Sequence, residues 1–230
     1  MHTMTIDGLF NVRGDEPSAP WLVRSGTTEK LTAAGTAELR RLGVTMILDL
    51  REPDEVSGTC PGLPVVSVPL FGQPAPTAGR LEDIYDRLLL ERGHAFARAV
   101  AHVADADGGV LVHCTAGKDR TGLLTALTLA AVGIGSETIS ADYAQSGGSI
   151  RSVRGHIAAR IADEADPELR EEILRLHLDS PREAIDHALS TLEGLGGSVS
   201  YLRRHGLTDE QLAQLRRKAG SGDTAQRRSA

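Results

Sequence analysis

The segment from Gly108 to Leu124 reads GGVLVHCTAGKDRTGLL and joins a predicted strand to a predicted helix. Residues Val110–His113 have the short apolar run of a strand inside a sheet. Residues Thr121–Val132 are almost wholly apolar, which predicts a helix that is buried on most of its sides. Between them the predicted loop Thr115–Arg120 contains one glycine and two cationic side chains. A strand, a short loop and a helix N-terminus in this order favour an anion-binding site.

Two side chains at this loop are suited to phosphate chemistry. Cys114 comes directly after the strand, and Arg120 follows six positions later. Successive backbone N–H groups of such a loop can form a concave anion site, and the next helix adds the partial positive charge of its N-terminus. The planar guanidinium of Arg120 matches the spacing of phosphate oxygens. The same positive field favours the thiolate form of a cysteine, so the pattern predicts a thiolate that faces a bound phosphoryl group.

The composition excludes several classes of protein. The chain has 230 residues, of which 40% are hydrophobic, so it can bury one sizeable core. A net charge of −6 and an aromatic content of 3% argue against a nucleic-acid partner. The two cysteines, Cys60 and Cys114, are too few for a disulfide framework or an all-cysteine zinc site. We expect no metal and no other cofactor, because Arg120 and the loop backbone supply the positive field.

The apolar segments of the sequence indicate the cellular location of the protein. Residues Met1–Gly14 contain no apolar run of signal-peptide length. The longest apolar stretch, Leu123–Ile134, is too short to span a bilayer. We therefore expect a cytoplasmic protein without an integral membrane segment, and export without a signal segment stays open.

The order of elements predicts an α/β fold with a central, largely parallel sheet flanked by helices, because strands and helices alternate along the first 146 residues. A helical C-terminal block follows. The expected strands are Trp21–Arg24, Val44–Leu50, Val65–Leu70 and Val110–His113. The expected helices are Ala33–Leu42, Leu81–Asp105 with a break near Gly93, Thr121–Val132, Glu137–Gln145, Ile150–Glu164, Pro167–Leu178, Pro181–Leu195 and Asp209–Ala219.

We expect one domain over residues 1–219 and a disordered tail over residues 220–230, which is polar and contains glycine and serine. Residues 147–185 are either a helical lid over the active site or an ordinary helical appendage. The lid hypothesis places a hinge at Gly147-Gly148.

The loop sequence HCTAGKDRTG, residues 113–122, resembles the signature loop of the cysteine-dependent protein tyrosine phosphatases. It is most similar to the bacterial branch whose loop reads His-Cys-x-x-Gly-Lys-Asp-Arg-Thr-Gly. The resemblance extends over about residues 9–219 and implies a tyrosine-phosphatase-like fold. Its further landmarks are Asn11-Val12-Arg13, Arg24-Ser25-Gly26, Leu31-Thr32, Ile47–Arg51 with Pro53 and Glu55, Asp142-Tyr143 and Gly197–Thr208.

The resemblance implies a role for each loop residue. Cys114 is the nucleophile that forms a phospho-cysteine intermediate, and Arg120 binds the equatorial phosphate oxygens. The phosphate also binds to the backbone N–H groups of Thr115, Ala116, Gly117 and Lys118. The Lys118 side chain either adds charge at the rim, binds a second phosphate or is simply solvated.

Three further residues, two of them next to the loop, have either a supporting role or none. His113 supports the loop by hydrogen bonding, or is a plain structural histidine. Thr121 either donates to the thiolate or is an ordinary residue of the first helical turn. Cys60 is a bystander or a redox partner of Cys114.

The general acid is the least determined residue. The chain has no Trp-Pro-Asp segment, and its only tryptophan is Trp21. The resemblance points to Asp119, inside the loop itself. Asp49, at the end of the strand Val44–Leu50, is the second candidate, and Asp83 and Asp86 are weaker ones.

Three functions compete. The leading one is a phosphatase that hydrolyses phosphotyrosine, with phosphoserine and phosphothreonine as further substrates. The Lys118-Asp119 pair resembles that of enzymes that act on lipid phosphates, which makes a phosphoinositide phosphatase of the same fold the second function. The third is an inactive phosphate-binding module, although both Cys114 and Arg120 are present.

Overall fold

The computed structural model describes residues 1–58 and 62–226, with side chains as far as residue 220. Within these ranges six strands form one sheet in the order β1-β2-β3-β6-β4-β5. β3, β6, β4 and β5 are parallel to one another, whereas β1 and β2 extend one edge as antiparallel strands. The largely parallel sheet predicted from the sequence is therefore confirmed. The strands are β1 (His2–Thr3), β2 (Arg13–Gly14), β3 (Leu22–Ser25), β4 (Val44–Asp49), β5 (Val65–Ser67) and β6 (Gly109–His113).

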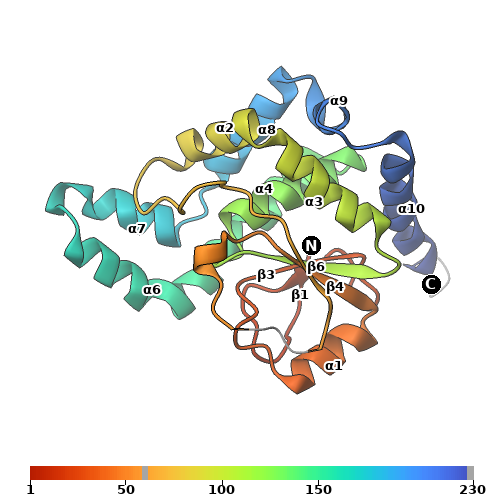
Figure 1. The fold of residues 1–230 in the computed structure, drawn as a ribbon, viewed down its shortest axis with the longest axis horizontal. Coiled ribbons are helices and arrows are strands. Elements are labelled where there is room, and N and C mark those ends of the chain that lie inside the picture. The colour runs from red at the N-terminus through yellow and green to blue at the C-terminus, as the bar shows by residue number, and fades with distance from the viewer. Residues whose placement is uncertain (59–61, 227–230) are drawn as a thin grey trace.

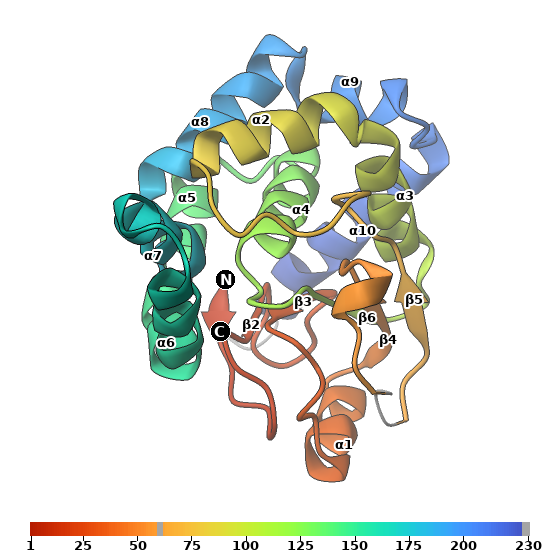
Figure 2. The same ribbon diagram turned by 60° about the vertical axis from the view of Figure 1, so that its left-hand side comes forward.

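Helices cover both faces of this sheet (Figure 1). α1 lies alone below it, and a thick helical layer lies above it around α4 (Figures 1 and 2). The helices are α1 (Ala33–Arg41), α2 (Leu81–Glu91), α3 (Gly93–Asp105), α4 (Asp119–Ala131), α5 (Ser136–Ala144), α6 (Ser146–Glu164), α7 (Arg170–Leu178), α8 (Arg182–Gly194), α9 (Gly197–Arg204) and α10 (Asp209–Gln226). Two single turns of 3-10 helix are η1 (Pro53–Glu55) and η2 (Pro167–Leu169).

The central strand β6 explains why the site lies where it does. All five of its residues are buried, and it pairs in parallel with β3 on one side and β4 on the other. The register places His113 opposite both Ser25 and Asp49. Because parallel strands end at the same edge of a sheet, the segments that follow β3, β4 and β6 meet there.

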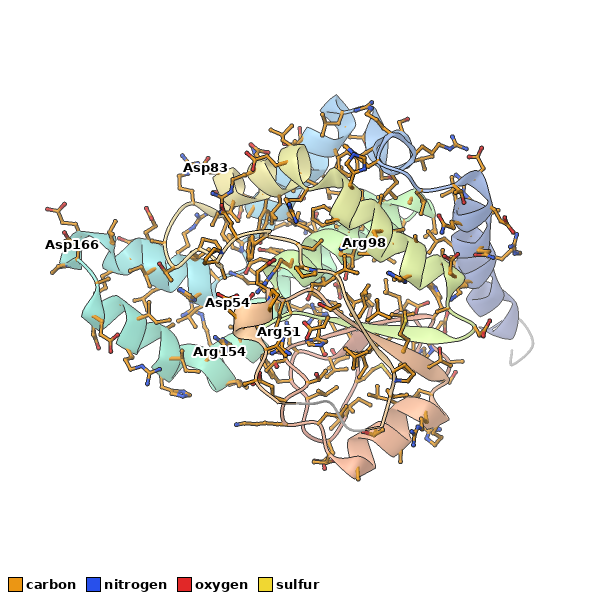
Figure 3. The ribbon with its side chains drawn as sticks, viewed as in Figure 1. Arg51, Asp54, Asp83, Arg98, Arg154 and Asp166 are labelled. Atoms are coloured by element: carbon orange, nitrogen blue, oxygen red, sulfur yellow. The ribbon has the colours of Figure 1, made fainter. Side chains whose placement is uncertain are left out.

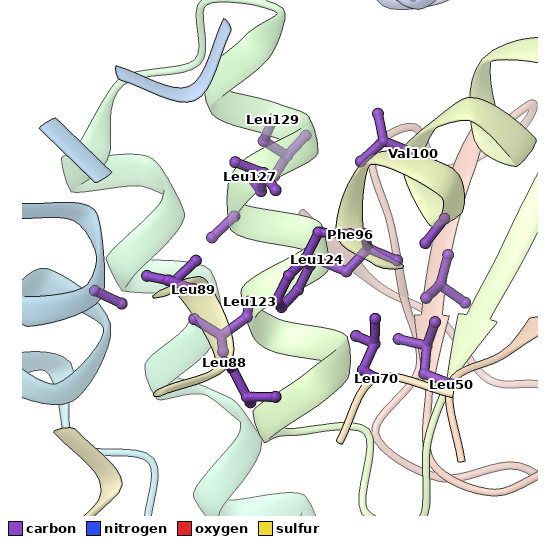
Figure 4. Close-up of a cluster of buried hydrophobic side chains, with 14 of the residues drawn as sticks. Leu50, Leu70, Leu88, Leu89, Phe96, Val100, Leu123, Leu124, Leu127 and Leu129 are labelled. Carbon is purple, nitrogen blue, oxygen red and sulfur yellow. The ribbon is translucent and has the colours of Figure 1, made fainter. Parts of the chain in front are cut away.

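Alternation along β6 builds two cores. Val110 and Val112 face the helical layer, and Leu111 faces α1. The larger core packs leucines of α4 against Phe96 and Val100 of α3 (Figure 4). This packing confirms the prediction of an almost wholly buried helix after the loop. Since α4 is fixed on several sides, its first turn is a rigid support for the side chains that it carries.

The helical block at 147–185 forms a hairpin of α6 and α7 that stands beside the sheet (Figure 2). Asp166, between the two helices, lies at its outer tip (Figure 3). The helix boundary before the block lies at Gln145, between α5 and α6, and Gly147 and Gly148 lie inside α6, so the chain is helical at the proposed hinge. Whether the hairpin moves as a lid stays a prediction.

The end of the chain differs from the expected helix Asp209–Ala219. α10 continues to Gln226, and residues 227–230 lie outside the described residues, so disorder at the terminus stays untested. Within the described ranges no helix has both the length and the apolar character needed to cross a membrane.

Candidate active site

The loop between β6 and α4 is shorter than expected. β6 ends at His113, and α4 begins at Asp119, so Asp119 and Arg120 belong to the first helical turn and not to the loop. Their backbone is thus held by helical hydrogen bonds, while Cys114 to Lys118 remain for the turn itself. The Cys114 side chain is buried, with 2% of its surface exposed.

Gly117 makes this tight turn possible. Its φ is +69°, a region that side chains other than glycine rarely occupy. A Cβ atom there would lie 2.2 Å from the carbonyl oxygen of Ser25 at the end of β3. The loop therefore packs directly onto the neighbouring strand, which only glycine permits.

The carbonyl groups of the loop accept hydrogen bonds from residues outside the loop. Asn11 Nδ2 donates to the oxygens of Ala116 and Gly117 at 3.2 and 3.0 Å, and Arg24 Nη2 donates to Gly117 at 2.8 Å. The Thr27 N–H donates to the oxygen of Thr115. In a trans peptide the C=O and the next N–H point in opposite directions. The N–H groups of residues 116, 117 and 118 therefore point away from this support, as a phosphate-binding concavity requires.

A buried ionic network anchors that support. Asp142 of α5 accepts hydrogen bonds from Arg13 at 2.6 Å and from Arg24 at 2.7 Å. Burial alone would raise the pKa of Asp142, but the charges of Arg24 and Arg13 hold it below its usual value. Burial lowers the pKa of Arg13 to about 10, so it remains charged at neutral pH. Arg13 also donates to Asn11 Oδ1 at 2.6 Å, which orients the Asn11 amide toward the loop.

Arg120 is held in one orientation by a carboxylate. Its two Nη atoms both bind Glu55 of η1, and its Cζ lies 4.5 Å from the centre of the Phe71 ring. Although burial raises the pKa of Glu55, its hydrogen bonds from Arg120 outweigh that effect and lower it to about 2. Among the described residues no hydrogen bond is made by Arg120 Nε, so the Nε edge of the guanidinium is free for another anion.

Asp119 is oriented by a buried tyrosine pair. Tyr85 Oη donates to Asp119 Oδ1 at 2.7 Å and lies 2.5 Å from Tyr143 Oη. Burial, together with the charge of Asp119, raises the pKa of Tyr85 well above its usual value. Tyr85 is therefore a permanent donor at physiological pH and fixes the carboxyl group of Asp119.

The Lys118 side chain does not lie at the rim of the site, where the sequence placed it. Its side chain is fully buried, and Nζ donates to the carbonyl oxygens of Leu176 and Asp179 at 2.5 and 2.7 Å. These carbonyls belong to the C-terminal end of α7, where four carbonyl groups lack helical partners. Nζ also lies 3.3 Å from Asp119. Lys118 thus joins the loop to the helical block, and its Nζ is bound to protein carbonyl groups instead of lying at the rim.

Asp49 also differs from its expected place near the mouth of the site. Arg51 binds both of its carboxylate oxygens, with Nη2 at 2.8 Å from Oδ2. Burial opposes ionisation of Asp49, but hydrogen bonds from Arg51 lower its pKa. This pairing favours the ionised form of Asp49 and so disfavours Asp49 as a proton donor. Asp49 lines a separate cavity of about 330 Å³ with Thr28 and Arg51.

The remaining candidates have supporting or remote positions. His113 is fully buried, with Nδ1 3.3 Å from the oxygen of Cys114 and Nε2 3.6 Å from Asp49. Thr121 Oγ1 is buried and has no hydrogen-bond partner within the described part of the chain, so the expected bond to Cys114 is absent. Asp83 is exposed at the start of α2 (Figure 3), and Asp86 binds His187 and Thr191. Cys60 lies outside the described residues.

One cavity of about 160 Å³ collects the reactive groups. Cys114, Asp119 and Arg120 line it together, with Thr115 and Ala116 from the loop. Part of its wall is apolar and comes from segments distant in sequence. These apolar residues are Phe71, Ala75, Pro76, Ile84 and Leu176. The cavity can therefore hold a phosphoryl group against a nucleophile while its organic substituent contacts the apolar wall.

The sequence alone gives no role to Glu55, Tyr85 or Arg154. Glu55, which is only a family landmark in the sequence, and Arg154 line the cavity, whereas Tyr85 is fully buried and contacts Asp119. Their partners or neighbours in the site lie 34 to 65 positions away, as in the pairs Tyr85–Asp119 and Glu55–Arg120. The position of Glu55 two residues after a proline, just past a buried strand, was the only local signal.

Comparisons with known proteins agree with this geometry. The sequence model of the tyrosine phosphatase family matches residues 8–219 of this chain. The chain is 30% identical to the triple specificity protein phosphatase PtpB of Mycobacterium tuberculosis, over 85% of this chain and 89% of that protein. It is 27% identical to a tyrosine-protein phosphatase of Nostoc commune, over 86% of this chain and 74% of that one.

A solved structure is more distantly similar. The crystal structure of TpbA from P. aeruginosa aligns with 71% of this chain and 91% of its own, at 22% identity and a TM-score of 0.40. The family assignment rests on the sequence match, which covers the whole of the sheet from β2 onward and every residue of the candidate site. The chain belongs to the tyrosine phosphatase family, and the enzyme class expected from its loop is confirmed.

Proposed function

We propose that this chain is a cysteine-dependent phosphatase that hydrolyses phosphotyrosine in proteins, with phosphoserine and phosphothreonine as further substrates. The observation that carries the proposal is that Cys114, Asp119 and Arg120 line one cavity. Phosphoryl transfer through a covalent intermediate needs a nucleophile, a proton donor and a fixed cation. The printed name of the M. tuberculosis relative, a triple specificity phosphatase, supports a broad range of substrates.

In the first step the thiolate of Cys114 attacks phosphorus, and the bond from phosphorus to the leaving oxygen breaks as the S–P bond forms. The protonated Asp119 gives its proton to that oxygen, so tyrosine leaves as a neutral phenol. The Nε edge of Arg120 and the N–H groups of residues 116–118 stabilise the charge on the equatorial oxygens. Glu55 acts through Arg120 as a positioning residue.

In the second step water attacks phosphorus and the S–P bond breaks. The carboxylate of Asp119 accepts a proton from the water, phosphate leaves, and the thiolate of Cys114 is restored. The Tyr85 hydroxyl holds the Asp119 carboxyl group through both steps. No cofactor enters either step.

The cavity favours phosphotyrosine over a phosphoinositide. Its apolar wall, including Phe71 and Ile84, suits an aromatic ring, whereas the hydroxyl groups of an inositol ring would lose water there without gaining partners. The Lys118 side chain, which the sequence offered for a second inositol phosphate, is bound to carbonyl groups of the helical block.

The proposal is tested with 4-nitrophenyl phosphate, phosphotyrosine peptides, phosphoserine peptides and phosphoinositide vesicles under reducing conditions. We expect phosphotyrosine peptides to be the best substrates. Cys114→Ser should lower kcat on the order of 10⁴-fold or more while phosphate still binds, because the loop and Arg120 remain. A wild-type protein that binds phosphate but hydrolyses none of the four substrates would be a phosphate-binding module instead.

A further inference from the structure

Arg154 of α6 is a cation of the active-site cavity that has no assigned partner. Its side chain lines the cavity together with Cys114 and Arg120. Figure 3 shows it on the side of the helical block that faces η1, the turn that carries Asp54. Within the described residues its guanidinium makes neither a hydrogen bond nor an ion pair.

Four other arginines around the loop each have a carboxylate partner. Arg13 and Arg24 bind Asp142, Arg51 binds Asp49, and Arg120 binds Glu55. After Cys114, the acids that act on Arg154 are Glu29 and Glu55, and both are already paired, with Arg51 and Arg120. The guanidinium of Arg154 therefore lies in the cavity without a carboxylate partner, because the nearby carboxylates bind other arginines.

Burial of an unpaired cation costs free energy, because the guanidinium loses water without gaining an acceptor. The lowered pKa of Arg154, caused by desolvation, reflects that cost. Unpaired charges in clefts are more common at binding sites than in structural regions. An anion that enters the cavity with the substrate would remove the penalty.

In the proposed mechanism the reacting phosphoryl group already has its hydrogen-bond donors. Arg120 and three N–H groups of the loop supply its donors, all from the β6–α4 junction. Arg154 comes from a different element, α6, so it approaches the cavity from the helical block. A second anionic group of the substrate, close to the phosphorylated one, is the ligand that this arrangement fits.

We propose that Arg154 binds an acidic side chain adjacent to the phosphotyrosine of a peptide substrate. The inference rests on the proposed phosphotyrosine phosphatase function. A peptide is favoured over a polyphosphorylated inositol because the cavity wall is apolar and because Lys118 is not free to bind a further phosphate. Arg154 is thus a specificity-determining residue, and the site selects peptides with Asp or Glu next to the phosphotyrosine.

The test compares two phosphotyrosine peptides that differ only in flanking residues, Glu in one and Gln in the other. We expect wild-type kcat/KM to be about fivefold higher for the Glu peptide, as for a partly screened ion pair. Arg154→Ala should remove this preference, Arg154→Lys should keep part of it, and Arg154→Glu should reverse it. 4-Nitrophenyl phosphate lacks the second anion, so Arg154→Ala should slow its hydrolysis less than it slows hydrolysis of the Glu peptide.

Arg160→Ala is the matched control, because it removes the same charge from an exposed position of the same helix. The inference is wrong if the Glu preference survives in Arg154→Ala, or if Arg154→Ala slows 4-nitrophenyl phosphate as much as the Glu peptide. It is also wrong if the variant loses activity on phosphoinositide vesicles more than on the peptide. If wild type hydrolyses no phosphotyrosine substrate, the proposed function fails first and this inference with it.

Discussion

At the scale of single residues, a specific neighbour fixes the orientation of Arg120 and another fixes that of Asp119. Glu55 binds the two Nη atoms of Arg120, and the Nε edge, which we propose binds phosphate, makes no hydrogen bond within the described residues. Tyr85 holds the carboxyl group of Asp119. Neither neighbour touches the reacting atoms in our account. Both reduce the rearrangement that the site must undergo when a phosphoryl group enters.

The assignment of Asp119 as the acid predicts a dependence on the leaving group. In Asp119→Asn we expect kcat for phosphotyrosine and alkyl phosphates to fall about 10²–10⁴-fold, because their leaving oxygens need a proton. The first step with 4-nitrophenyl phosphate should change little, since 4-nitrophenolate leaves without one. Pre-steady-state rates for a series of aryl phosphates measure this difference.

Asp83→Asn is the control, because it makes the same change at an exposed position of α2. It should behave like wild type on every substrate. Equal first-step rates for Asp119→Asn and wild type across the whole leaving-group series would show that another residue is the acid.

At the scale of elements, the sequence predicted the strands and helices that have their own local pattern. β6 and α4 lie within one or two residues of their expected bounds, and the break near Gly93 separates α2 from α3. The two-residue strands β1 and β2 were not expected, because their pairing depends on β3 and not on local apolar alternation. The expected strand Val65–Leu70 is three residues long in the structure, as β5.

The geometry of the loop predicts a large effect at Gly117. Gly117→Ala should destabilise the fold by more than the ~1–3 kcal/mol of a strained φ, because the new Cβ also collides with the Ser25 carbonyl. Activity should fall with it, since the N–H groups would no longer converge. Urea unfolding and hydrolysis of 4-nitrophenyl phosphate are the measurements.

Gly155→Ala is the matched control within α6. A Cβ at that position meets no atom within 4 Å, and its φ is ordinary for a helix. We expect it to stabilise the protein by about 0.5–1 kcal/mol and to keep full activity. If Gly117→Ala were as stable and active as Gly155→Ala, the loop would not have the conformation described above.

At the scale of the whole molecule, Asp142 connects parts of the chain that are distant in sequence. It joins β2 through Arg13 and β3 through Arg24 to the C-terminal half of α5. Arg24 in turn donates to the carbonyl oxygen of Gly117 in the loop between β6 and α4. These contacts span 118 and 129 positions, so no local pattern could reveal them. The sequence showed the partners as separate family landmarks, and only the fold shows that they are one network.

This network predicts a strong and global effect of one substitution. Asp142→Asn leaves two buried guanidinium groups without a counter-charge, and we expect it to lower the free energy of unfolding by about 3–5 kcal/mol. Asp163→Asn, which breaks an exposed pair with Arg170, should cost at most about 1 kcal/mol. Urea denaturation of both variants gives the comparison, and equal losses would remove the network from the account.

The central claim is a covalent phosphoryl group on Cys114, and the most direct test is to trap it. In Asp119→Asn the second step lacks its base, so 4-nitrophenyl phosphate should load the enzyme faster than water unloads it. Rapid mixing followed by denaturation and peptide mass spectrometry measures the adduct. We predict a burst of one 4-nitrophenolate per enzyme and a phosphoryl group on the peptide that contains Cys114, with neither in Cys114→Ser. Turnover of substrate without a burst, or with the phosphoryl group on another residue, would contradict the account.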